Sequence, residues 1–217
     1  GHAAAVLRGL IYAAGGSTGG TLASVERFDG GAHSTWALVA SMGTARYFFA
    51  LVALEEGGPS HHGGMLVAAG GFYNGNTAEA YDPVADQWAA IAGMATPRGY
   101  CAGAALGGKA YVSGGCGGDV CTSVEVFDPA TGKWAAAPPM GTARYYHAAA
   151  ALVVGGTARI YVSGGSDGSN GGADKSASGA GDGTVDDIGV RLIDAAARGN
   201  ATEVSILLET FGVDPSG

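Results

Sequence analysis

The chain has 217 residues, of which 41 are glycine and only 14% are charged. Its formal net charge is −8; residues 166–217 carry most of the excess, and residues 1–165 are close to neutral. The absence of a basic stripe argues against nucleic acid as the main partner. Abundant glycine favours tight turns over long helices, and every apolar run is shorter than the roughly 18 residues that a membrane-spanning helix needs.

The first residues, Gly1-His2-Ala3-Ala4-Ala5, lack the basic region, long apolar segment and cleavage site of a secretory signal. The three cysteines do not form the even framework that is typical of a small secreted domain. We therefore expect a cytoplasmic protein with no membrane segment.

Three sequence markers recur with a common period of about 50 residues, which predicts several copies of one supersecondary unit. In the copy that begins at Ala95, short runs rich in β-branched and aromatic residues are separated by turn residues, so they are expected to be strands. The markers are the double glycines Gly15-Gly16, Gly70-Gly71, Gly114-Gly115 and Gly164-Gly165, the tryptophans Trp36, Trp88 and Trp134, and the arginines Arg46, Arg98 and Arg144.

Two copies share the order of a double glycine, an aromatic residue followed by Asp-Pro, and a tryptophan. They read Gly70-Gly71, Tyr81-Asp82-Pro83, Trp88 and then Gly114-Gly115, Phe127-Asp128-Pro129, Trp134. This pattern resembles the kelch repeat, the four-stranded blade of a β-propeller. In the first copy, Gly30 instead of proline follows Phe28-Asp29. The resemblance covers about residues 1–165 and implies an all-β fold: a partial kelch propeller of four-stranded antiparallel blades.

The number of blades is unusual for this resemblance, since kelch propellers have about five to seven of them. The sequence supplies three whole repeats and half of a fourth, and the first copy begins within a strand, because Gly1-His2-Ala3 aligns with Tyr146-His147-Ala148. We expect a fragment of a longer protein that forms an open arc with exposed ends.

The pattern stops after Gly165. Residues 166–186 contain six glycines, four serines and four aspartates and no aromatic residue, which predicts a flexible linker. A long loop inside the fourth blade is the alternative. Residues 187–217 change to a helical period, and Leu192-Ile193-Asp194-Ala195-Ala196 and the residues that follow resemble one ankyrin repeat. That resemblance implies a helix–turn–helix hairpin; an unrelated helical hairpin is the alternative.

Each repeat carries a glutamate two residues before its aromatic residue, on the same face of the predicted strand. Both faces of a propeller strand are covered, so such a carboxylate needs a partner, and the recurrent arginines are the candidates. We predict structural ion pairs in the blades; a ring of arginines for an anionic ligand is the alternative. The residues are Glu26, Glu79 and Glu125 with Arg46, Arg98 and Arg144.

Kelch domains that recruit proteins use residues just after the double glycine and near the start of the innermost strand. The resemblance therefore implies a partner-binding ring, in which exposed aromatic residues would supply the binding energy; the alternative is that these are ordinary strand residues. Carried onto this chain, the first set is Ser17, Phe72, Cys116 and Ser166, and the second is Phe48, Tyr100 and Tyr146.

No catalytic residue, cofactor or metal ligand is predicted. The pair Cys116 and Cys121 allows half a zinc site or a local disulfide, but no second pair or suitably spaced histidine follows. His61-His62 lies in a glycine-rich loop, and His147 in an apolar strand is expected to be packed. No nucleophile elbow, phosphate-binding loop or metalloprotease motif occurs.

Two functions fit this sequence. The first is a non-catalytic protein–protein interaction scaffold, in which the propeller loops and the ankyrin-like helices bind protein partners. A role as a substrate adaptor for ubiquitin ligases rests on analogy alone, because no BTB or F-box segment is present. The second is an enzyme, since galactose oxidase and certain sugar-acid mutarotases also use kelch propellers. No copper-binding set of tyrosine and histidine is evident, so its site would lie partly in missing blades.

Overall fold

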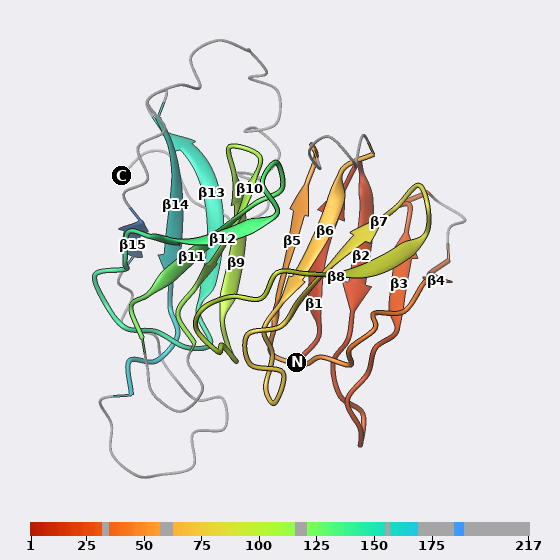
Figure 1. The fold of residues 1–217 in the computed structure, drawn as a ribbon, viewed down its shortest axis with the longest axis horizontal. Helices are drawn as coiled ribbons and strands as arrows, with labels where there is room; N and C mark the ends of the chain where they lie inside the picture. The colour runs from red at the N-terminus through yellow and green to blue at the C-terminus, as the bar shows by residue number, and fades with distance from the viewer. Residues whose placement is uncertain (32–34, 57–62, 116–120, 155–156, 169–184, 189–217) are drawn as a thin grey trace.

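Fifteen β-strands in four antiparallel sheets make up the computed structural model, which describes residues 1–31, 35–56, 63–115, 121–154, 157–168 and 185–188 (Figure 1). None of these residues is helical. Three sheets have four strands in chain order. Sheet 1 holds β1 (Ala3–Leu7), β2 (Leu10–Ala14), β3 (Val25–Phe28) and β4 (Ala37–Val39); sheet 2 holds β5 (Ala50–Leu54), β6 (Met65–Ala69), β7 (Ala78–Asp82) and β8 (Gln87–Ile91); sheet 3 holds β9 (Ala102–Leu106), β10 (Lys109–Ser113), β11 (Val124–Asp128) and β12 (Lys133–Ala137).

Sheet 4 has three strands, β13 (Ala148–Val154), β14 (Thr157–Ser163) and β15 (Val185–Ile188). The sequence predicts only half of this blade, and it places residues 185–188 at the end of a linker and the start of a helical hairpin. Instead, Val185 pairs with Ser163 and Ile188 with Ile160, so β15 is a strand of the fourth sheet. Strands β14 and β15 therefore belong to one sheet, which is compatible with the long-loop alternative. The expected ankyrin-like helices over 189–217 lie outside the described residues.

Tight turns between the first two strands of sheets 1 and 3 explain why short apolar runs become hairpins there. Arg8 and Gly9, between β1 and β2, both have positive φ angles, of 53° and 76°. Gly107 and Gly108 adopt the same kind of turn between β9 and β10, with φ angles of 59° and 72°. Two residues with positive φ match the twist of paired strands, and glycine adopts such angles at little cost.

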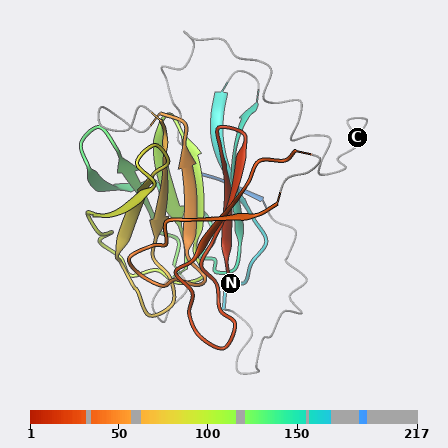
Figure 2. The same cartoon turned by 90° about the vertical axis from the view of Figure 1, so that its right-hand side faces the viewer.

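The core forms between neighbouring sheets. Strand β6 is buried along its whole length because sheet 2 is covered on both faces. Leu7 and Tyr12 of sheet 1 pack with Leu66 of sheet 2 in one apolar cluster. The first strands β1, β5, β9 and β13 contact one another in that order. Sheets 3 and 4 lie on the left of Figure 1 and sheets 1 and 2 on the right, and Figure 2 shows the same arrangement turned by 90°. Stacking of this kind covers faces that a single sheet leaves open.

The three tryptophans occupy matching places at the start of the fourth strand of sheets 1, 2 and 3. Each contacts the aromatic residue opposite it on the third strand, with ring centroids 5.2 to 5.4 Å apart, in the pairs Phe28–Trp36, Tyr81–Trp88 and Phe127–Trp134. The indole nitrogens of Trp88 and Trp134 also donate hydrogen bonds to the preceding connection, to the carbonyl oxygens of Ala40 (3.0 Å) and Ala92 (2.7 Å). The expected four-stranded repeat is therefore present.

Candidate protein-binding surface

A buried arginine anchors the connection that enters sheet 2. The Arg46 guanidinium is fully buried and lies 2.8 Å from Glu79 Oε1 on β7. It also donates to the carbonyl oxygens of Gly70 (2.6 Å) and Thr77 (3.0 Å). The Glu79 carboxylate further accepts hydrogen bonds from the backbone N–H groups of Gly43 and Thr44. A buried ion pair of this kind satisfies its remaining polar atoms through these additional bonds.

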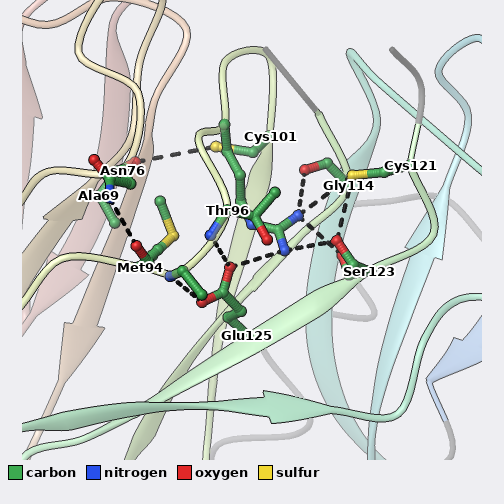
Figure 3. Close-up of polar contacts among 11 residues, drawn as sticks. Ala69, Asn76, Met94, Thr96, Cys101, Gly114, Cys121, Ser123 and Glu125 are labelled. Atoms are coloured by element: carbon green, nitrogen blue, oxygen red, sulfur yellow. Dashed lines mark hydrogen bonds and ion pairs between the residues drawn. The ribbon is translucent and has the colours of Figure 1, made fainter. Parts of the chain in front are cut away.

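Sheet 3 repeats the arrangement around Arg98 (Figure 3). Arg98 Nη2 lies 3.1 Å from Glu125 Oε1, and Nη1 donates to the Gly114 carbonyl oxygen at 2.8 Å. The local surroundings differ, because Ser123 Oγ and Cys121 Sγ also accept from this guanidinium, at 2.8 and 3.6 Å. Arg98 Nε has no partner among the described residues, whereas Arg46 Nε donates to Glu79.

The remaining predicted pair members are placed differently. Arg144 is buried and donates to the Gly164 carbonyl oxygen at 2.7 Å, as its counterparts do in their sheets. Glu26 is exposed on β3 and pairs with no arginine among the described residues, which corrects the prediction for this residue. In sheets 2 and 3 the arginine that pairs with the glutamate lies in the connection before the sheet's first strand.

The arginine carbonyl groups fix the backbone that follows. The carbonyl oxygens of Arg46, Arg98 and Arg144 accept hydrogen bonds of 2.8 Å from the second glycine of a double glycine, Gly16, Gly71 and Gly115 respectively. Each of those glycines has a positive φ angle. The side chain and the carbonyl group of each arginine therefore hold the backbone just before the predicted residues Phe48, Tyr100 and Tyr146.

The predicted residues Phe48, Tyr100 and Tyr146 share a strained backbone conformation. Their φ angles are 53°, 59° and 57°, in the left-handed region that bulky side chains rarely adopt. A ladder of backbone hydrogen bonds joins them: Phe48 N–H donates to Gly1, Tyr100 to Phe48 and Tyr146 to Tyr100, at 2.8 to 3.0 Å. The same local strain thus recurs in three successive connections and places three aromatic side chains together.

The side chains of these residues form one continuous aromatic cluster. The Tyr100 ring centroid lies 4.4 Å from that of Phe48 and 4.3 Å from that of Tyr146. Phe72, the predicted residue after a double glycine, lies 5.4 Å from Tyr100. The hub cluster, as we name it, consists of Tyr47, Phe48, Phe72, Tyr73, Tyr100, Tyr145 and Tyr146.

The hub cluster is uncharged and partly exposed. Tyr73 is 87% and Tyr146 52% exposed, and the other rings are half-buried. Burial and neighbouring tyrosines raise the pKa of the Tyr47 and Tyr146 phenols, so both stay protonated at neutral pH. The cluster therefore presents aromatic faces together with hydroxyl groups that donate and accept hydrogen bonds.

Of the other predicted binding residues, the structure describes Ser17 and Ser166. Ser166 forms an isolated bridge with Tyr145, which ties it to the hub cluster. Ser17 is exposed and bridges to Thr21 in the corresponding loop of sheet 1. Cys116 lies outside the described residues, as does the His61-His62 pair. Sequence reasoning missed Tyr47, Tyr73 and Tyr145, although each directly precedes or follows a residue that it selected.

A buried serine–histidine contact lies between sheets 3 and 4. His147 Nε2 is 2.8 Å from Ser113 Oγ, and the ring is only 8% exposed. Burial, with the nearby Arg144 and Arg98 charges, lowers the pKa of His147 to about 4. The imidazole is therefore neutral at physiological pH. Its Nδ1 atom has no partner among the described residues, so the ring is packed, as expected, but incompletely hydrogen-bonded.

The cysteines are chemically distinct. Burial raises the pKa of the free Cys101 thiol to about 11, which makes it unreactive at neutral pH. Cys121 is disulfide-bonded. Within the described part of the chain, no three histidine, cysteine or acidic side chains gather as a metal site, and no helix has the length and apolar character to cross a membrane.

Two segments of the chain match a known repeat motif. The kelch motif matches residues 1–43 and 97–141, which cover strands of sheets 1 and 3. Two segments of the chain are thus similar to the kelch motif. Sheet 2 lies between them and has the same strand order and the same buried ion pair as sheet 3.

Several kelch-like proteins are similar in sequence to just over half of this chain. Kelch-like protein 33 of Homo sapiens is 37% identical over 125 residues, which are 54% of this chain and 22% of that protein. Kelch-like protein 36 of Bos taurus is 37% identical over 123 residues, 52% of this chain and 18% of its own length. Kelch-like protein 35 of Mus musculus is 36% identical over 122 residues, which are 54% of this chain and 19% of that protein. The chain thus matches about a fifth of the length of these relatives.

Proposed function

We propose that this chain is a non-catalytic protein-binding module and that the hub cluster is its contact surface. The observation that carries the proposal is the repeated left-handed backbone at Phe48, Tyr100 and Tyr146. Each such residue costs on the order of 1 kcal/mol or more, and strain of this kind concentrates at functional sites. The same cost at three equivalent places supports a role beyond packing.

The chemistry of the hub cluster supports a protein partner. Tyrosine and phenylalanine supply large contact area with few rotatable bonds, and they are enriched at binding hot spots. Arg46 and Arg98 are buried and already bind a carboxylate and carbonyl oxygens within their own sheets. This speaks against the alternative of an arginine ring for anions.

The role as a substrate adaptor belongs to the same proposal. It rests on the kelch-like homologues, and the partner's identity is open. The cytoplasmic location and the ankyrin-like hairpin over 189–217 likewise remain predictions.

Peptide selection tests the hub cluster directly. A phage-displayed random peptide library is panned on the protein, and the enriched peptides are titrated by fluorescence polarisation. The test variant replaces Phe48, Tyr100 and Tyr146 with asparagine, which tolerates positive φ and so removes the rings without removing the backbone conformation. We expect binding to weaken at least about tenfold, since a hot-spot ring contributes about 2 kcal/mol.

Val84→Asn is the matched control, because Val84 is 80% exposed in the turn between β7 and β8, outside the hub cluster. It should bind the selected peptides as the unchanged protein does. Thermal melting checks that the triple variant remains folded. Equal peptide affinity of the folded triple variant and the unchanged protein would remove the proposal, as would a selection that enriches no peptide.

A further inference from the structure

Three rings of the hub cluster belong to sheet 2, and we call them the sheet 2 triad. Tyr47 lies in the connection before β5, and Phe72 and Tyr73 directly follow β6 and its double glycine. The ring centroids lie 5.5 Å (Tyr47–Phe72), 6.2 Å (Tyr47–Tyr73) and 4.4 Å (Phe72–Tyr73) apart. The ring planes are inclined to one another by 57° to 64°. A flat group that stacks on one of these rings can therefore also contact a second one.

Hydrogen bonds within sheet 2 hold the triad in place. The Phe72 N–H group donates to the Tyr47 carbonyl oxygen at 3.0 Å, and the Asn74 side-chain amide donates to the Ala45 carbonyl oxygen at 2.6 Å. The Asn74 N–H group donates in turn to the Gly71 carbonyl oxygen at 3.1 Å. The loop after β6 is thereby fixed to the connection before β5, and both belong to an inner sheet.

The sheet 2 triad offers ring faces and hydroxyl groups without a positive charge. Tyr73 is 87% exposed, and Tyr47 and Phe72 are half-buried. Burial, and then the neighbouring tyrosines, raise the pKa of Tyr47, whereas a nearby cation would lower it. Among the described residues, no arginine or lysine therefore acts on this phenol.

The described basic side chains lie elsewhere in the repeats. Arg46, Arg98 and Arg144 are buried and donate to carbonyl groups of their own sheets. The hub cluster lies where the first strands of sheets 2, 3 and 4 begin, whereas the remaining basic residues lie within strands or toward the opposite end. These are Arg8 in the turn after β1, Arg27 on β3, Lys109 and Lys133 at the starts of β10 and β12, and Arg159 on β14. Within the described part of the chain, no side chain places a cation on the triad.

We propose that the sheet 2 triad binds an arginine side chain of a protein partner, an inference that rests on the proposed role of the hub cluster as contact surface. The guanidinium group is planar, so it stacks on aromatic rings, whose faces attract a cation. It carries five N–H donors and no acceptor, which suits the hydroxyl oxygens of Tyr47 and Tyr73. The net charge of −8 also favours the approach of a basic segment.

Other side chains fit the triad less well. A carboxylate would meet the negative ring faces with no described cation beside them. A leucine or valine side chain would contact the rings but leave the hydroxyl groups unused. A lysine ammonium group is more strongly hydrated than a guanidinium group and does not stack as a plane. Arginine is therefore the occupant that uses the rings and the hydroxyl groups together.

The peptides selected by panning test this occupant. Each enriched peptide is synthesised with arginine and with citrulline, the uncharged counterpart of similar shape, and both forms are titrated on the full chain by fluorescence polarisation. We expect arginine to be enriched over the unselected library. The citrulline forms should bind about fivefold more weakly, as for loss of a cation stacked on partly exposed rings.

Three variants assign this preference to the triad. Phe72→Leu keeps an apolar side chain but removes a ring, so the preference for arginine over citrulline should fall. Tyr73→Asn removes an exposed ring at a position whose φ angle of 72° asparagine tolerates, and it should show the same loss if Phe72→Leu melts at a lower temperature than the unchanged protein. Tyr73→Phe is the matched control, because it keeps the ring and should keep most of the preference.

The possible outcomes separate this inference from the proposed function. Enriched peptides that require Phe48, Tyr100 and Tyr146 but carry no excess of arginine would overturn the arginine site and leave the contact surface intact. Equal binding of the arginine and citrulline forms would do the same, as would an unchanged preference in both Phe72→Leu and Tyr73→Asn. A selection that enriches no peptide would remove the proposed function and this inference with it.

Discussion

At the scale of single residues, buried arginines determine where the aromatic side chains lie. Arg46 and Arg98 each join a carboxylate, two carbonyl oxygens and the neighbouring double glycine. Because these groups are removed from water, loss of the arginine leaves a buried carboxylate without its counter-charge. We therefore expect these arginines to have a structural role and to affect any ligand only indirectly.

Arg98→Ala should lower the free energy of unfolding by about 3 kcal/mol, because it breaks a buried ion pair. Lys109→Ala is the comparison, since Lys109 forms an ion pair of 2.9 Å with Asp128 but is 44% exposed. An exposed pair contributes at most about 1 kcal/mol. Urea denaturation of both variants measures the difference. Unchanged stability of Arg98→Ala together with lost peptide binding would instead support a direct role in ligand binding.

His147 should make the protein acid-sensitive. Its pKa is about 4 in the folded protein, below the ordinary value of 6.5, so the unfolded chain binds the extra proton first. Stability from this group is complete above pH 6.5 and is lost as pH falls toward 4, by up to about 1.4 kcal/mol per pH unit. Denaturation of the unchanged protein and His147→Gln across this range isolates the effect. Parallel pH profiles of the two proteins would contradict it.

At the scale of elements, hydrogen bonds from one repeat to the connection before it join adjacent sheets. The Trp134 indole donates to Ala92 and the Trp88 indole to Ala40, whereas Trp36 makes no such bond to a described residue. Asp86 also contacts the connection that contains Ala40, because its Oδ1 accepts a hydrogen bond from Ala40 N–H at 2.9 Å. This hydrogen bond lowers the pKa of Asp86. In sheets 2 and 3 the fourth strand therefore holds the connection that leads into its sheet.

Trp134→Phe should lower the free energy of unfolding by about 1 kcal/mol, the net value of one hydrogen bond. Trp36→Phe preserves the ring contact with Phe28 and removes no bond to a described residue, so it should change stability less. Chemical denaturation monitored by circular dichroism compares the two. Equal losses would show that ring size, and not the inter-sheet bond, determines the stability of these positions.

At the scale of the whole molecule, the described strands form a row of four sheets, in which each inner sheet packs against two others and each outer sheet against one. Stability in such a stack is a sum over repeats and their interfaces, so the ends open more readily than the middle. Hydrogen exchange at low protein concentration should show slower exchange in β6 and β10 than in β2 and β14. Uniform protection across all four sheets would mean that the molecule opens as one unit.

The sequence predicted the repeated strands well, because the glycines, tryptophans and arginines each mark a fixed place in the repeat. It also selected four of the seven aromatic residues of the hub cluster, Phe48, Phe72, Tyr100 and Tyr146. It missed β15, since Val185–Ile188 carries none of those markers and follows a long glycine-rich segment. It also did not predict that Glu26 is exposed, because burial of this carboxylate depends on a connection outside its own strand. Backbone strain at Phe48 and Tyr100 has no signature in residue type.

The aromatic position of the first repeat is a glycine. Gly1 accepts the hydrogen bond from Phe48 N–H that Phe48 and Tyr100 accept in their turn, yet it contributes no ring. A methyl group placed on Gly1 would lie 3.2 Å from the Phe48 ring, so a larger side chain would have to displace that ring. The rings of the hub cluster therefore come from the connections into sheets 2, 3 and 4, and Gly1 adds none at sheet 1. A peptide that binds the hub cluster, as proposed, would therefore contact the connections into sheets 2, 3 and 4.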